Sequence, residues 1–125
     1  MSLIAVDTRS RKPIYEQLVD NISELVVKKD IAPGEQLPSV RALAGELAIN
    51  PNTIQRAYNE LEHLGVIVSI PGRGNFIPED ISQLLNSKRK DSLSALGEKM
   101  FEAKNSGVTR SEVNDLADKI WEDKK

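Results

Sequence analysis

The stretch PSVRALAGELAINPNTIQRAYNELEHLG, residues 38–65, carries two series of apolar residues at helical spacing with a break between them. The break ends at Asn50-Pro51, a favoured N-cap followed by a proline at the first helical position. Gly65 follows the second series, where glycine commonly ends a helix. The stretch therefore predicts a helix-turn-helix. Its apolar positions are Val40, Leu43, Ala44 and Leu47 in the first helix and Ile54, Ala57, Tyr58, Leu61 and Leu64 in the second.

The sequence on either side extends this unit into a larger fold. A further apolar series starts after Pro13 and predicts a helix that ends near Asp30, preceded by an irregular arm over residues 1–12. After Gly65, residues 66–70 are rich in β-branched side chains, and a proline-glycine turn leads to a short return strand at 75–77. The order helix, helix, turn, helix, hairpin predicts a winged helix-turn-helix, a mainly α fold with a small β-hairpin.

Residues 79–125 return to a helical pattern and predict a short tail of two helices. Thr109 and Glu112 form a capping box that starts the second of them. Ser87–Ser92 fits the apolar stripe poorly, which leaves the path of the chain there open. Two amphipathic helices of this length need a partner surface, which can be the winged domain, the other tail helix or a second copy of the chain. Modules of this type commonly dimerise so that two recognition helices meet two half-sites, and packing within one chain is the alternative. We therefore predict residues 1–78 as the winged domain and residues 79–125 as a helical dimerisation tail.

Composition excludes several classes of function. The chain has 125 residues, a net charge of -2 and no cysteine, so a wholly basic surface, a disulfide framework and a cysteine-ligated metal site are excluded. The single histidine, His63, offers no catalytic or metal constellation, so we expect no enzyme activity, cofactor or metal. No signal peptide or apolar span occurs, which predicts a cytoplasmic protein that does not enter a membrane.

The outward face of the helix after Asn50 carries the residue types that read DNA bases. Asn52, Gln55, Arg56 and Asn59 share this face at helical spacing. Asparagine and glutamine can pair with adenine, and arginine with guanine, in the major groove. A merely solvated polar face fits the helix alone equally well. Three residues outside it favour DNA: Ser39 and Arg41 open the preceding helix, and Arg73 lies between two glycines at the hairpin tip.

Several motifs in order give the chain a resemblance to a known family. They are PIYEQ at 13–17, PGEQLPSVR at 33–41, NPNTI at 50–54 and GRGNF at 72–76. Together they resemble the GntR family of bacterial transcription regulators, and the NPNT form with the short tail resembles its YtrA subfamily. The resemblance implies a winged helix-turn-helix that binds operator DNA, with a tail that dimerises.

The resemblance also carries roles onto individual positions. It implies that Arg41, Thr53 and the wing at Gly72–Gly74 contact the operator. Asn50-Pro51 and Gln55 depart from the family pattern, since other members often carry Ser-Arg or Thr-Arg at the former and arginine at the latter. The base-reading code of other members therefore cannot be transferred. Arg56 faces outward one turn past Pro51 and is predicted to read a base, whereas Arg73 is predicted to meet phosphate or the minor groove. The alternative is that Gln55 is the main base reader and Arg56 lies on the DNA backbone.

These observations predict a sequence-specific transcription regulator, a repressor that binds a two-fold-symmetric operator as a homodimer. The alternative is a winged-helix module that binds protein, for which apolar residues are expected on the outward face. The sequence identifies no effector ligand. The predicted DNA-binding residues are Ser39, Arg41, Asn50, Asn52, Thr53, Gln55, Arg56, Gly72, Arg73 and Gly74. The predicted dimerisation residues are Leu84, Leu85, Leu93, Leu96, Met100, Phe101, Leu116, Ile120 and Trp121.

Overall fold

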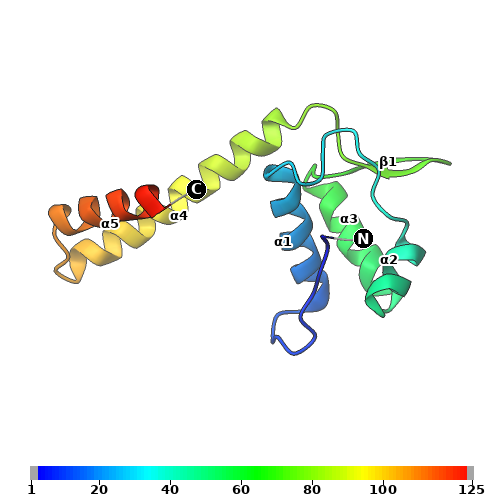
Figure 1. The fold of residues 1–125 in the computed structure, drawn as a ribbon, viewed down its shortest axis with the longest axis horizontal. Coiled ribbons are helices and arrows are strands. Elements are labelled where there is room, and N and C mark those ends of the chain that lie inside the picture. The colour runs from blue at the N-terminus through cyan, green and yellow to red at the C-terminus, as the bar shows by residue number, and fades with distance from the viewer. Residues whose placement is uncertain (1–2, 124–125) are drawn as a thin grey trace. The chain divides into compact units, whose positions relative to one another are not determined.

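A computed structural model of the protein describes residues 3–123, which contain five helices and one two-stranded hairpin (Figure 1). The described residues form two compact units that divide between Leu85 and Asn86. The first unit contains a three-helix group and the hairpin, and the second contains helices only. The predicted fold class, a winged helix-turn-helix followed by a helical tail, is confirmed.

The first unit is built around its third helix. α1 (Ile14–Val27), α2 (Val40–Leu47) and α3 (Pro51–His63) occupy the predicted positions, and α3 packs against both of the others. The apolar side of α3 is buried at every turn, which makes it the centre of a single aliphatic core. Its buried members on α3 are Ile54, Ala57, Tyr58 and Leu61.

Side-chain caps begin both helices of the helix-turn-helix, and the cap at Asn50 was predicted. The Ser39 hydroxyl accepts a hydrogen bond from the Ala42 amide (3.0 Å), and the Asn50 side-chain oxygen accepts one from the Asn52 amide (2.8 Å). These bonds satisfy amides that have no partner inside the helix. Between the two helices, Ala48 takes a left-handed conformation (φ 57°, ψ 46°) that ends α2.

Replacing Ala48 with glycine should stabilise the fold. The left-handed conformation costs an L-residue roughly 1–2 kcal/mol, whereas the greater freedom of an unfolded glycine costs about 0.5–1 kcal/mol. We expect Ala48→Gly to raise the free energy of unfolding by about 0.5–1 kcal/mol in urea titrations. Ala42→Gly, at an exposed position inside α2, should lower it by a similar amount. Equal losses in both variants would contradict this account of the turn.

The first strand of the hairpin is shorter than expected, and a third segment pairs with the second strand. β1 (Val68–Ile70) pairs antiparallel with β2 (Gly74–Phe76). Val66 is buried and stays out of the strand because its amide donates to the Leu61 carbonyl (2.9 Å) and closes the end of α3. On the other edge of β2, residues 34–37 run alongside it through three backbone hydrogen bonds of 2.8 Å each. The sequence patterns did not indicate this third strand-like segment.

The helix after the hairpin does not break where the apolar stripe weakens. α4 (Ser82–Asn105) is continuous through residues 87–92. Its first turn belongs to the first unit, since Ile81 is buried in the core and Leu84 and Leu85 pack against it half-buried. The compact first unit therefore continues to Leu85, past the expected boundary at Pro78.

The second unit consists of the rest of α4 and α5 (Arg110–Asp123). The predicted capping box starts α5: the Thr109 amide donates to the Glu112 carboxylate (2.9 Å) and the Glu112 amide donates to the Thr109 hydroxyl (3.1 Å). α4 and α5 line a common groove, but no residue of this unit with a described side chain is fully buried. The unit has no core of its own.

Candidate nucleic-acid interface

The outward side of α3 is polar along its exposed length, as the sequence predicted. Asn52, Gln55, Arg56 and Asn59 are all exposed, while Thr53 is half-buried. The first turn of the helix contains no acidic residue, and Glu60 is the first acid along it. The first turn of α3 therefore presents amide groups without carboxylates of its own, whereas Arg56 has Glu60 one turn further along the same helix.

Three of the four predicted reading side chains have contacts that divide them into two groups. The Gln55 amide nitrogen donates to the Asn59 side-chain oxygen at 2.9 Å, which links two side chains one helical turn apart. The Arg56 guanidinium instead lies over the ring of Tyr15 on α1, 3.8 Å from the ring centre. Arg56 is thus held against α1 by a cation–π contact, whereas Gln55 and Asn59 form a pair held by each other.

Two of the predicted DNA-contact residues also act as N-caps. The Ser39 and Asn50 side-chain oxygens cap α2 and α3, so each is already bonded to a backbone amide. Arg41, in the first turn of α2, is exposed and lies in none of the described ion pairs of residues 3–123. Arg41 therefore presents an exposed positive charge that can meet a phosphate.

A buried hydroxyl fixes the start of α2 relative to α3. Tyr58, 2% exposed, donates from its hydroxyl to the Pro38 carbonyl at 2.7 Å. Burial, and then the nearby Glu46 carboxylate, raises the pKa of Tyr58, so the hydroxyl keeps its proton and remains a donor. This bond holds the backbone just before Ser39. The sequence pattern marked Tyr58 only as an apolar core position.

The wing ends in the predicted type II turn. The Arg73 amide donates to the Ile70 carbonyl (2.9 Å), and Gly72 takes the positive φ of 77° that the third position of this turn requires. Gly74 also has a positive φ, of 121°. The turn leaves Arg73 exposed at the tip of the hairpin.

The predicted dimerisation residues divide between the two units. Leu84 and Leu85 contact the core of the first unit. The other seven are between 42% and 72% exposed, which leaves a large apolar surface uncovered within this chain. They are Leu93, Leu96, Met100 and Phe101 on α4 and Leu116, Ile120 and Trp121 on α5.

Residues 3–123 offer neither a metal site nor a membrane span. The described side chains contain no group of three or more histidines and carboxylates placed to bind a metal ion. None of the described helices combines the length and the apolar character needed to cross a bilayer.

Comparison with known proteins agrees with this geometry. Residues 14–77 match the family described as bacterial regulatory proteins, gntR family. The chain is 37% identical to the HTH-type transcriptional repressor YtrA of Bacillus subtilis, over 98% of this chain and 95% of that protein. The chain belongs to the gntR family. This GntR-family chain is accordingly a DNA-binding transcription regulator.

Solved structures extend the likeness to both parts of the GntR-family chain. A transcriptional regulator from Oenococcus oeni is 37% identical, with a TM-score of 0.80 over 94% of this chain and 98% of that one. The DNA-binding domain of AraR, solved in complex with operator ORE1, is 25% identical, with a TM-score of 0.51 over 58% of this chain and 88% of that one. The first match includes the helical tail, and the second spans a length close to that of the winged unit.

Proposed function

We propose that this chain represses transcription by binding a two-fold-symmetric operator as a homodimer. The observation that carries the proposal is the exposed Gln55–Asn59 pair on a helix whose opposite face is buried in a winged-helix core. A helix of this kind enters the major groove and reads base edges. The likeness to the YtrA repressor and to an operator-bound domain supports DNA as the partner and repression as the outcome.

Gln55 is the main base reader in this proposal. One hydrogen of its amide nitrogen is engaged by Asn59, which leaves the second hydrogen and the side-chain carbonyl oxygen free. A donor beside an acceptor is the pattern that adenine recognises in the major groove. Arg56, whose guanidinium lies over Tyr15, contacts the DNA backbone in this proposal.

The start of α2 and the wing supply affinity without sequence preference. Arg41 lies in the first turn of α2, and Arg73 lies at the wing tip. Both are exposed cations that can meet phosphates or the minor groove. They supply positive charge beside α3 in a chain whose net charge is -2.

The tail pairs two copies of the chain. Its seven exposed apolar side chains have no cover within the chain, and the second unit has no core of its own. Apolar stripes on two helices are buried effectively by the same stripes of a second copy. We infer that the protein acts without a cofactor or catalytic step, on DNA in the cytoplasm.

A footprint on selected DNA tests the proposal. Genomic fragments retained by the purified protein should share an inverted repeat, because a symmetric dimer presents two identical reading helices. The half-site centres should lie about 10 base pairs or a multiple apart, on one face of the duplex. Retention of fragments without a common sequence, or protection of a single asymmetric half-site, would contradict the proposal.

A further inference from the structure

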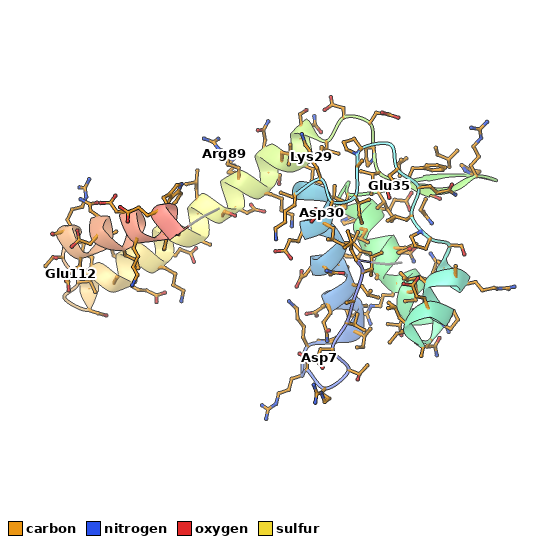
Figure 2. The ribbon with its side chains drawn as sticks, in the orientation of Figure 1. Asp7, Lys29, Asp30, Glu35, Arg89 and Glu112 are labelled. Atoms are coloured by element: carbon orange, nitrogen blue, oxygen red, sulfur yellow. The ribbon has the colours of Figure 1, made fainter. Side chains whose placement is uncertain are left out.

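One side chain outside the predicted DNA-binding residues reaches the wing. Gln36 lies on the strand-like segment 34–37, next to Glu35, which Figure 2 labels beside the hairpin. Its side-chain amide nitrogen donates to the main-chain carbonyl of Arg73 at 2.8 Å. Gln36 also pairs with Phe76 as an isolated antiparallel bridge, so its own backbone is anchored to β2. The bond thus connects a fixed strand to the tip of the hairpin.

The backbone of the tip is shaped to receive this amide. A β-carbon added to Gly74 would lie 2.7 Å from the Gln36 amide nitrogen, too close for any unmoved side chain. The positive φ of Gly74 is a second reason for glycine at this position. Any other residue there would displace the Gln36 amide from the Arg73 carbonyl.

The tip has few other restraints. The Arg73 amide bonds back to Ile70 within the hairpin itself, which shapes the turn but does not tie it to the helices. Among the described residues 3–123, the Gln36 amide is the one side chain that hydrogen-bonds the tip residues 71–74. The backbone hydrogen bonds between residues 34–37 and the hairpin reach Asn75 and Ile77 but not residues 71–74, so the Gln36 amide extends that support to the tip.

We propose that Gln36 is a positioning residue for DNA binding. Its amide holds the wing tip in one orientation before DNA arrives, so that Arg73 meets the DNA without first being ordered. Gln36 acts through Arg73 and does not itself need to touch DNA. The proposal rests on the proposed function, since it assigns the wing a contact with DNA.

The orientation of the tip is tested first on the free protein. Gln36→Met keeps the length of the side chain and removes the donor. Backbone NMR relaxation should show greater motion at Arg73 and Gly74 in this variant, with an unchanged unfolding midpoint. Gln83→Met, the same change at an exposed position in the first turn of α4, should leave the backbone motion of Arg73 and Gly74 unchanged. Unchanged relaxation in Gln36→Met would overturn the proposal, whatever DNA the protein binds.

Binding measurements then test whether Gln36 acts through Arg73. The probe is the tightest duplex that the purified full-length protein selects from a randomised library. A hydrogen bond of ordinary strength corresponds to roughly a twofold to tenfold change in affinity per protomer, which we expect for Gln36→Met. In an Arg73→Ala background the same change should cost less than about twofold, because the main-chain carbonyl remains but the side chain that the bond positions toward DNA is already absent.

The outcomes separate this inference from the function on which it rests. Equal losses from Gln36→Met in both backgrounds would show that Gln36 acts independently of Arg73 and would overturn the proposal. Failure of the unaltered protein to select any sequence would contradict the proposed function. The relaxation experiment would still decide whether Gln36 orders the tip.

Discussion

Leu116→Glu combined with Ile120→Glu should convert the full-length protein from a dimer to a monomer and weaken operator binding at least a hundredfold. The two side chains lie one turn apart on α5 and are 58% and 54% exposed in the single chain. Carboxylates at these positions would have to lose their water in an apolar interface, which is costly for an unpaired charge. A monomer also loses the advantage of two linked half-sites, worth roughly a hundredfold to ten-thousandfold.

Sedimentation velocity and operator titration measure the two parts of this prediction. Asn114→Glu, an added carboxylate at a polar exposed position of the same helix, should leave the protein dimeric and fully active. Circular dichroism of each variant shows whether the winged unit stays folded. A double variant that still sediments as a dimer would place the interface elsewhere. A monomer with unchanged affinity would contradict binding through two half-sites.

Gln55→Ala should abolish most of the sequence discrimination while leaving weak binding to other DNA intact. A well-formed bidentate contact to a base is worth about 1–3 kcal/mol per half-site, and a symmetric dimer loses it twice. The loss should appear on the selected operator and not on a scrambled duplex of the same length. The physical reason is that Gln55 is exposed on α3 and is already oriented by its hydrogen bond to Asn59.

Arg56→Ala, at the neighbouring position of α3, is the variant to compare with Gln55→Ala. The Arg56 guanidinium rests on Tyr15, so its removal should weaken operator and scrambled DNA by similar factors. Fluorescence anisotropy titrations of both variants against both duplexes decide the assignment. A loss confined to the operator in Arg56→Ala, with Gln55→Ala behaving as the unaltered protein, would identify Arg56 as the base reader.

Local signals in the sequence are enough to predict the helices of the winged unit. The N-caps at Ser39 and Asn50, the proline at the start of α3 and the glycine after it each act within one turn of the chain. The type II turn at Gly72 and the capping box at Thr109 are local in the same sense. Such signals depend only on residues close by in the sequence, so they can be recognised before the fold is known.

The ends of helices and strands were less predictable where tertiary packing competes with the local preference of a residue for helix or strand. Val66 has a β-branched side chain, yet its amide closes α3 and its side chain enters the core. Leu84 and Leu85 continue an apolar stripe that the sequence assigns to the tail, but the first unit covers them. Periodicity shows that a face is apolar and does not show which surface covers it.

Patterns along the chain were enough to predict the class of fold, the buried and exposed sides of α3 and the side-chain chemistry on its exposed side. Which of those side chains are held, and by which partners, depends on tertiary packing. Arg56 is held by Tyr15 on α1, and the Arg73 carbonyl is held by Gln36, a partner 37 positions earlier in the chain. Contacts of this kind depend on how separate elements pack in space, and no pattern along the chain records them.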